Sequence, residues 1–200
     1  MNDAFSPFIE MLEARLPLSE ADKRLLQENL RLCSYSKGEF LLRSGEISRA
    51  FFYNLSGFIR LFYVRNQIEK TAWFYAEGQF VSAYESYVRQ TPSQLNLQAM
   101  EDSSVICISM EAAMRLLTHD PKFSVLARII MEDELIAHQK MVASLISDRP
   151  EDRYQALLDE NPAIFQRIPQ HYIASFIGVT PESLSRIKKR LQNKNLTQGQ

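Results

Sequence analysis

The chain has 200 residues, of which 46% are hydrophobic and 24% charged, and its formal net charge is −1. These values are typical of a soluble globular protein with one large domain or two small ones, and they exclude a generally basic protein. No run of 18 apolar residues and no leader-like N-terminus occurs, so we expect a cytoplasmic protein without membrane contact.

The charge is unevenly distributed along the chain. Residues 1–148 hold fifteen Lys and Arg against nineteen Asp and Glu, a balance of −4, whereas residues 149–200 hold eight against five, a balance of +3. Within residues 182–200 the ratio is five to one. Basic character is therefore concentrated at the end of the chain, which favours a local nucleic-acid contact there.

The first two elements are predicted to be helices, over residues 5–16 and 19–32. Ser19 begins a capping pattern, and leucines follow it at roughly helical spacing. From residue 33 to 108 the apolar period changes to two, with dense aromatic and β-branched residues and glycine turns. Such short strands indicate an antiparallel sandwich or small barrel. Residues 82–90 interrupt them as a short helix or loop that lines the barrel.

The two cysteines, Cys33 and Cys107, both lie in these strands and have no CxxC partner. Their apolar neighbours predict buried, reduced thiols with a structural role and disfavour a disulfide or a redox sensor.

Helices return after the barrel, over residues 110–117 and 121–147 and then 151–158. The long helix carries apolar residues on more than one face. We expect one face to pack on the barrel and another on a second subunit, which predicts a homodimer.

Residues 168–191 are predicted to form two short helices with a sharp turn. Ile173, Ala174 and Ile177 share one face of the first helix, and Gly178 stands where the chain must turn. Thr180 suits the N-cap of the second helix and Pro181 its first position. This is the pattern of a helix-turn-helix whose second helix enters the major groove of DNA.

The second helix keeps a polar and basic surface after its apolar face is buried. The candidate DNA-binding residues are Thr180, Glu182, Ser183, Ser185, Arg186, Lys188, Lys189 and Arg190. The alternative for this stretch is a plain helical hairpin with a solvated basic face.

The whole chain resembles the Crp/Fnr family of bacterial transcription regulators. The resemblance rests on KGEFLLRSGE at residues 37–46, FFYNLSGFIRL at 51–61 and IPQHYIASFIGVTPESLSRIKKRL at 168–191. It implies an α+β fold: a β-roll sensor of the cyclic-nucleotide-binding kind at 1–120, a dimerisation helix at 121–147 and a DNA-binding domain at 148–200. It also implies double-stranded DNA as a partner and suggests RNA polymerase as another.

The family's nucleotide cassette is not matched. Cyclic-nucleotide binders of the family hold the phosphate with a Gly-Glu-Leu segment and, about ten residues later, an Arg-Ser pair. An ungapped alignment puts residues 82–84 (Ser, Ala, Tyr) and 93–94 (Ser, Gln) at these places. The arginine and the ribose acceptor are both missing, so we predict no response to cAMP.

A different small-molecule effector can still be accommodated in the same region. The candidate pocket residues are Tyr84, Glu85, Arg89, Ser93, Gln94 and Asn96, with Arg89 a possible substitute cation. The alternative is a barrel filled by its own aromatic side chains.

No cofactor is expected. An iron–sulfur cluster needs about four thiolates, and the sequence has two cysteines. Haem needs a ligand in or near the barrel, and the first histidine, His119, follows it. His138 and His171 are isolated in the sequence and are interpreted as exposed or packing residues.

In the second helix of the predicted helix-turn-helix, comparison with the family position by position finds the family's acidic residue at Glu182 and its arginine at Arg186. Pro181 stands where family members commonly have another arginine. Glu182 can accept a hydrogen bond from cytosine N4, and Arg186 can donate to guanine O6 and N7. Lys188, Lys189 and Arg190 are better interpreted as contacts to the DNA phosphates. Residues 192–200 are too short for the two-stranded wing that many members carry, so no wing is expected.

Two other function classes compete with a transcription regulator. One is a small-ligand or nucleotide-sensing signalling module whose C-terminal helices bind a protein partner. The other is a metal-dependent barrel enzyme. Such enzymes bind their metal with histidines inside the barrel, and this sequence has no histidine before His119, which disfavours this class. No catalytic triad, P-loop or dinucleotide motif occurs, so an enzyme is not predicted.

Overall fold

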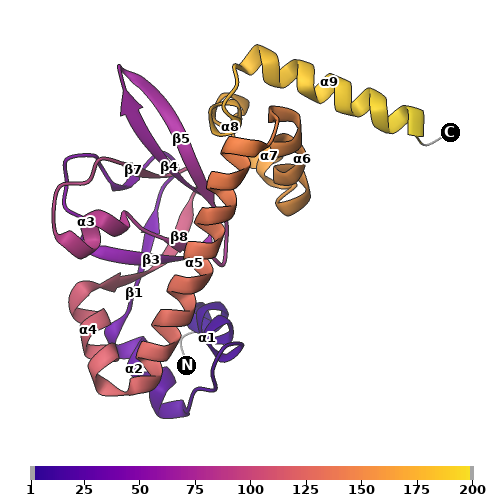
Figure 1. The fold of residues 1–200 in the computed structure, drawn as a ribbon. Coiled ribbons are helices and arrows are strands. Elements are labelled where there is room, and N and C mark those ends of the chain that lie inside the picture. The colour runs from indigo at the N-terminus through magenta and orange to yellow at the C-terminus, as the bar shows by residue number, and fades with distance from the viewer. Residues whose placement is uncertain (1–2, 199–200) are drawn as a thin grey trace.

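The computed structural model describes residues 3–198 and shows an α+β protein in which a β-roll, a long helix and a C-terminal helical group follow one another (Figure 1). In chain order the elements are η1 (Asp3–Phe5), α1 (Ser6–Glu13), α2 (Glu20–Asn29), β1 (Arg31–Tyr35), β2 (Phe40–Leu42), β3 (Ala50–Ser56), β4 (Ile59–Arg65), β5 (Ile68–Tyr75), β6 (Phe80–Val81), α3 (Tyr84–Arg89), β7 (Asn96–Ala99), β8 (Ser103–Ser109), α4 (Met110–His119), α5 (Pro121–Ser147), α6 (Pro150–Glu160), α7 (Ile164–Arg167), α8 (Gln170–Ile177) and α9 (Pro181–Gln198).

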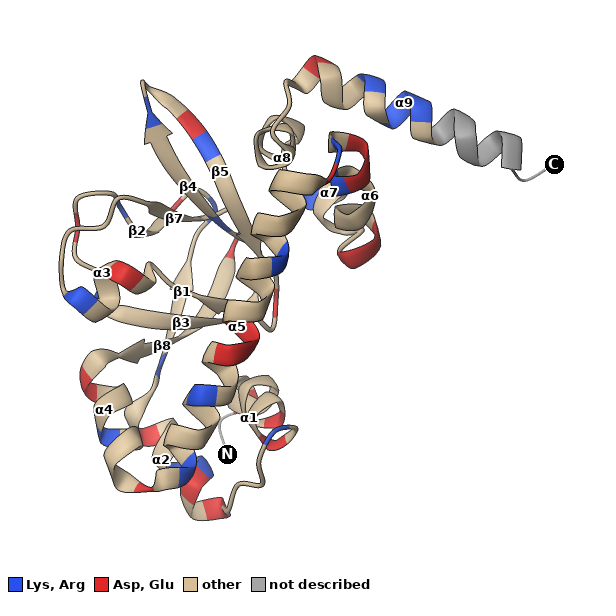
Figure 2. Ribbon diagram, in the orientation of Figure 1, with Lys and Arg blue, Asp and Glu red and all other residues tan. Residues whose placement is uncertain are grey.

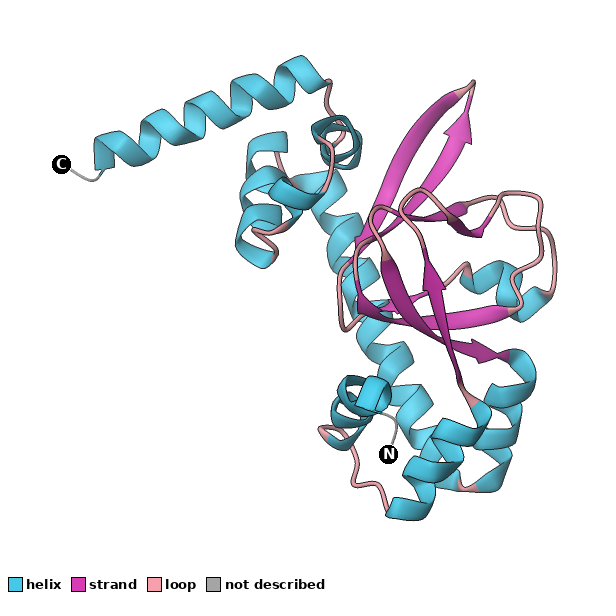
Figure 3. Ribbon diagram, turned by 180° about the vertical axis from the view of Figure 1, so that it is seen from behind, coloured by secondary structure: helices cyan, strands magenta, loops and turns pink. Residues whose placement is uncertain are grey.

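The predicted roll consists of two four-stranded sheets, with strand orders β1-β8-β3-β6 and β2-β7-β4-β5. All the strand pairs are antiparallel. The β4–β5 hairpin turns at Asn66 and Gln67, both with positive φ, and its tip extends beyond the rest of the roll (Figure 3). Strand β5 also contacts α8. The inward faces of both sheets form the central core around Leu97 and Val105. The predicted fold class is confirmed.

Helices α1, α2 and α4 gather at one end of the roll against the first half of α5 (Figure 3). The predicted cap at Ser19 is present, as a reciprocal capping box with Asp22. Lys122 at the start of α5 donates to the same carboxylate at 2.8 Å, so the box also fastens α2 to α5.

Helix α5 has the predicted bounds. Asp120 caps it, and Pro121 occupies its first position. Phe123, Leu126 and Ile130 are buried against the roll end. Its second half leaves apolar side chains exposed, with Leu135 at 60% and Ile146 at 82%. The long helix thus has one buried apolar face and one uncovered one, as its mixed pattern predicted.

Three local predictions were wrong. Residues 30–32 are not helical: Leu30 is extended, and Arg31 already pairs with Cys107, because joining the sheet satisfies the backbone better than another helical turn. The last helix does not end at residue 191 but continues to Gln198; residues 199–200 of the stretch in which no wing was expected lie outside the described residues. Cys33 and Cys107 are free but only half-buried.

None of the helices in the described part is long and apolar enough to cross a membrane.

Candidate nucleic-acid interface and ligand cavity

Helices α8 and α9 meet at a sharp turn. Gly178 ends α8 with φ of 81°, a conformation that L side chains rarely adopt. The Val179 N–H donates to the carbonyl of Ala174, and the Ser183 N–H donates to Thr180 Oγ1 at 3.3 Å. Thr180 therefore starts α9 as the sequence predicted.

The two helices are held together by a small core. Ile173, Ala174, Ile177, Leu184 and Ile187 are each at most 3% exposed. These are the apolar positions that the spacing selected. Because one face of α9 is buried in this core, the side chains on its other faces point outward.

The outward side of α9 is polar and basic. Glu182, Ser185, Arg186, Lys189 and Arg190 are exposed, as is Thr180 before the helix, whereas Ser183 and Lys188 are half-buried. Figure 2 shows that α9 projects away from the roll with its Lys and Arg positions along it. Arg190 forms an ion pair with Glu151 of α6 at 2.9 Å. Hydrogen bonds from its own N–H and from Thr180 lower the pKa of Glu182, so this carboxylate is ionised.

Arg153 is a structural residue of this region that sequence reasoning missed. Its Nε and Nη2 donate to the carbonyl of Ile177 at 3.0 and 2.7 Å, and its Nη1 donates to the carbonyl of Asp148 at 2.6 Å. It thus satisfies terminal carbonyls of α8 and of the α5–α6 junction together. Only the planar guanidinium fork reaches both.

The helical group is packed on the sheet that contains β5. The Thr71 N–H donates to Ser175 Oγ of α8 at 3.0 Å. Arg167 of α7 pairs with Glu77 and Glu101 and lies 4.2 Å over the ring of Phe58. One apolar cluster contains Phe58, Phe74 and Met100 of the roll together with the α8–α9 core. The roll and the helix pair therefore share a core.

Arg60 lies inside this contact and is 0% exposed. Its guanidinium is between the rings of Phe62 and Tyr172, at 4.1 and 3.7 Å from their centroids. Nε donates to Thr71 Oγ1 at 2.9 Å and Nη1 to Glu69 at 2.6 Å, while Nη2 has no partner among the described residues. Burial lowers the pKa of Arg60, and Glu69 opposes that effect.

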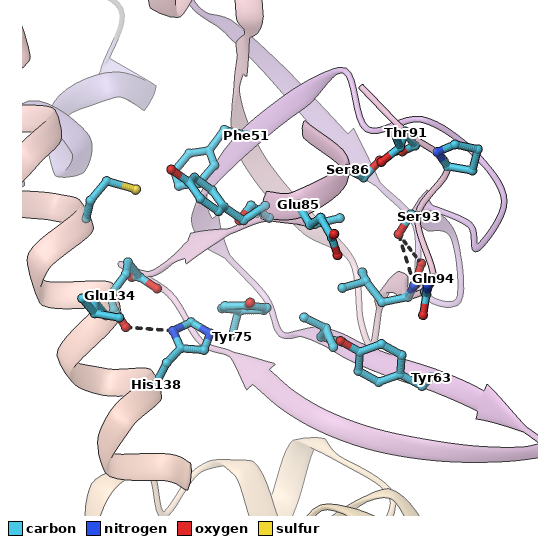
Figure 4. Close-up of a pocket in the computed structure, with 18 residues that line it drawn as sticks. Phe51, Tyr63, Tyr75, Glu85, Ser86, Thr91, Ser93, Gln94, Glu134 and His138 are labelled. Carbon is cyan, nitrogen blue, oxygen red and sulfur yellow. Dashed lines mark hydrogen bonds between the residues drawn. The ribbon is translucent and has the colours of Figure 1, made fainter. Parts of the chain in front are cut away.

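A cavity of about 770 Å³ lies between the second sheet, α3 and α5 (Figure 4). Its walls combine aromatic rings with hydroxyl, amide and carboxylate groups. The lining residues are Phe51, Leu61, Tyr63, Tyr75, Ser82, Ala83, Tyr84, Glu85, Ser86, Thr91, Pro92, Ser93, Gln94, Leu95, Met131, Glu134, Leu135 and His138. This volume is within the range of small-molecule sites, about 300–1,000 Å³.

The structure brings together four of the six candidate pocket residues: Tyr84, Glu85, Ser93 and Gln94 line the cavity. The other two are absent from its wall within the described part of the chain. Arg89 forms an ion pair with Glu85 at 3.6 Å, with both side chains largely exposed. The side chain of Asn96 accepts a hydrogen bond from the Ser44 N–H at 2.9 Å and so fixes a loop.

Helix α5 contributes a wall that sequence reasoning missed. Met131, Glu134, Leu135 and His138 follow one another at steps of three, one and three residues, which puts them on one side of a helix. His138 Nδ1 donates to the carbonyl of Glu134 at 2.8 Å, and its ring stacks on Trp73 at 5.6 Å. The helical spacing of these four residues is visible in the sequence. It indicates a cavity wall only when α5 is known to lie along the roll.

The cavity has an acidic character. Burial raises the pKa of Glu134, and His138 opposes that effect only in part. Among the described residues the Glu134 carboxylate has no hydrogen bond or ion pair. Burial and the nearby Glu134 raise the pKa of Tyr75. Among the described lining residues there is no Lys or Arg.

The thiols and the acidic side chains form no metal site among the described residues: no group of three His, Cys, Asp or Glu is placed to hold an ion. Burial raises the pKa of Cys107, and contact with Cys33 raises it further, so the thiol form predominates.

The family model of the cyclic nucleotide-binding domain matches residues 32–120, which contain the roll and α3. No curated protein matches the sequence.

Solved structures of bacterial regulators share the fold over most of both chains. FixK2 from Bradyrhizobium japonicum is 16% identical with a TM-score of 0.70, covering 83% of this chain and 86% of its own. A putative transcriptional regulator of the Crp/Fnr family from Eubacterium rectale is 16% identical with a TM-score of 0.66, covering 88% and 85%. The catabolite activator protein of Thermus thermophilus is 18% identical with a TM-score of 0.56, covering 92% and 88%.

Proposed function

We propose that the chain is a DNA-binding transcription regulator of the Crp/Fnr type that works as a homodimer in the cytosol and has no enzymatic role. The observation that carries the proposal is the α8–α9 pair: a packed first helix, a left-handed glycine turn, and a capped second helix with an outward basic face. A plain helical hairpin has no need of this combination. The shared fold with solved regulators supports the same assignment.

The side chains of α9 divide into two roles in this proposal. Arg186 and Glu182 lie in the first two turns, exposed and charged, where a guanidinium reads guanine and a carboxylate accepts from cytosine N4. Thr180, Ser183 and Ser185 supply short hydroxyls for phosphate oxygens. Lys188, Lys189 and Arg190 add sequence-independent attraction to the backbone.

Arg190 is the weakest of these candidates, because its ion pair with Glu151 already occupies the guanidinium. In the proposal it contacts phosphate only if DNA displaces Glu151, whereas Lys189 has no competing partner in the described part of the chain.

Dimerisation follows from the uncovered apolar side of α5. Leu135, Ile136, Val142, Leu145 and Ile146 are between 46% and 82% exposed on this one helix. A second copy packed on the same stripe would cover them in a two-fold interface. Two reading helices would then meet half-sites of a palindrome about one helical turn, or ~34 Å, apart.

RNA polymerase is a further partner of the DNA-bound dimer in this proposal. The cavity is the binding site of a small-molecule signal other than cAMP. A cyclic phosphate needs a charge-assisted donor, and no Lys or Arg occurs among the described lining residues.

Selection of random duplexes by the full chain tests the assignment. We expect enrichment of a palindrome. Arg186→Ala should change the selected base at one position of each half-site at a cost of about 1–3 kcal/mol, whereas Lys189→Ala should weaken binding to all sequences and lower the salt slope by about 1. Absence of any enriched sequence, with the wild-type protein folded, would refute the DNA-binding assignment.

A further inference from the structure

The charged groups of the cavity narrow the chemistry of its ligand. The wall contains the carboxylates of Glu85 and Glu134 and the imidazole of His138, and no Lys or Arg among the described residues. An anion entering this cavity would meet negative charge in surroundings less polar than water, where like charges repel more strongly. A cation would meet attraction at the same places.

The two carboxylates are not equivalent. Glu85 is exposed and is already paired with Arg89 at 3.6 Å. The carboxylate of Glu134 has no hydrogen bond or ion pair with any described residue, and its side chain is half-buried. It is therefore the carboxylate with a charge left to pair, and it projects from α5 at one side of the cavity (Figure 4).

Polar groups beside Glu134 suit a nitrogen cation. His138 Nδ1 hydrogen-bonds to the backbone carbonyl of Glu134, so Nε2 is the ring nitrogen that can pair with a ligand. Tyr75 is 3% exposed and lines the cavity, and a phenol hydroxyl can both donate and accept a hydrogen bond.

The remaining wall suits the body of such a ligand. Phe51, Tyr63, Tyr75 and Tyr84 present aromatic rings, and Leu61 and Leu95 add aliphatic surface. Aromatic faces attract ammonium groups, and the attraction strengthens when the site is desolvated.

We propose that the cavity between the second sheet, α3 and α5 binds a small organic cation, with its amine or quaternary ammonium group against Glu134 and its apolar body between Tyr63, Tyr75 and Phe51. The inference deepens the proposed function, because it names the chemical class of the signal for the same cavity.

Ligand pairs that differ mainly in charge test the proposal. The full chain is titrated calorimetrically, without DNA, with 2-phenylethylammonium, 3-phenylpropanoate, 3-phenylpropan-1-ol and cAMP. We expect the ammonium ion to bind and to raise the melting temperature. We expect its affinity to exceed that of the alcohol, and no binding of the carboxylate or of cAMP.

Two glutamate variants on α5 provide the matched comparison. Glu134→Gln keeps the shape of the wall and should weaken ammonium binding by about tenfold or more. Glu132→Gln should leave it unchanged, because Glu132 is exposed, pairs with Arg128 at 2.6 Å and does not line the cavity.

The proposal is overturned if the carboxylate probe binds as tightly as the ammonium, if Glu134→Gln and Glu132→Gln behave alike, or if no ammonium binding is measurable. None of these outcomes bears on DNA binding, which the duplex selection measures separately. Conversely, ammonium binding with no selected duplex would keep the ligand class and remove the transcriptional role.

Discussion

Replacing Arg60 distinguishes a buried charge from the packing that surrounds it. In Arg60→Met the linear apolar side chain retains most of the stem volume. The substitution removes the guanidinium and with it two ring contacts, which stabilise the fold by about 1–2 kcal/mol each. It also removes a hydrogen bond to Thr71, which contributes about 1 kcal/mol, and an ion pair with the 46% exposed Glu69, which contributes at most about 1 kcal/mol. Against this, the folded state no longer carries a desolvated cation with an unpaired Nη2, which costs several kcal/mol.

The opposing contributions nearly cancel, so Arg60→Met should change the free energy of unfolding by no more than about 1 kcal/mol. Arg60→Ala also removes the stem and leaves a cavity under Tyr172, which should cost about 2–4 kcal/mol. Glu69→Gln keeps the buried cation but takes away its counter-charge; the half exposure of Glu69 reduces the usual penalty to about 1–3 kcal/mol.

Urea denaturation followed by the fluorescence of Trp73, the only tryptophan, measures all three variants. Equal m-values would show that the differences lie in the free energy of unfolding. The expected order of destabilisation is Arg60→Ala, then Glu69→Gln, then Arg60→Met. If Arg60→Met destabilises the protein as much as Arg60→Ala, the charge itself stabilises the roll-to-helix contact, and the reasoning above is wrong.

Three further predictions address other parts of the chain. Arg153→Ala should lower the free energy of unfolding by about 2–3 kcal/mol and weaken DNA binding, and Arg153→Lys should not restore either, because a single ammonium cannot reach both carbonyls; denaturation and gel-shift titration check this. Burial would raise the pKa of Asp22, but hydrogen bonds from Lys122 and Ser19 lower it from 3.8 to about 2. A stabilisation of about 1–2 kcal/mol should therefore be present above pH 3.8 and disappear as the pH falls toward 2, a slope that Asp22→Asn should lack in acid titrations of unfolding. Ile146→Glu should make the protein monomeric in sedimentation at concentrations where Met114→Glu, the same kind of change at an exposed methionine of α4, leaves a dimer.

Much of the fold was predictable because its determinants are local. Thr180, Pro181 and Gly178 set the ends of α8 and α9 through their own backbone preferences, and the period-two segments set the strands. Residues 30–32 were misassigned because a helical leucine spacing ran into a strand, and only the pairing of Arg31 with Cys107 decides the boundary.

The cavity was predictable only on the side that the family cassette occupies. Four lining residues come from α3 and the loop after it: Tyr84, Glu85, Ser93 and Gln94. They could be predicted together because they lie within eleven residues of one another in the sequence. Glu134 and His138 come from a helix about 40 to 50 residues later in the chain. Their relevance depends on where α5 packs, which the helical pattern alone does not specify. Arg153 was missed for the same reason, since its partners are backbone carbonyls, which leave no trace in the side-chain sequence.

These distant residues also connect the cavity with the reading helices. His138 lines the cavity and stacks on Trp73, and Trp73 meets Phe176 of α8 edge to face at 6.3 Å. Two ring contacts therefore separate a ligand from the first helix of the pair. His138 is exposed and lines the cavity, so a displacement of its ring reaches Trp73 only through the stacked contact between the two rings. A ligand that binds Glu134 would bias this contact only if it binds more tightly to one arrangement of α5 than to another.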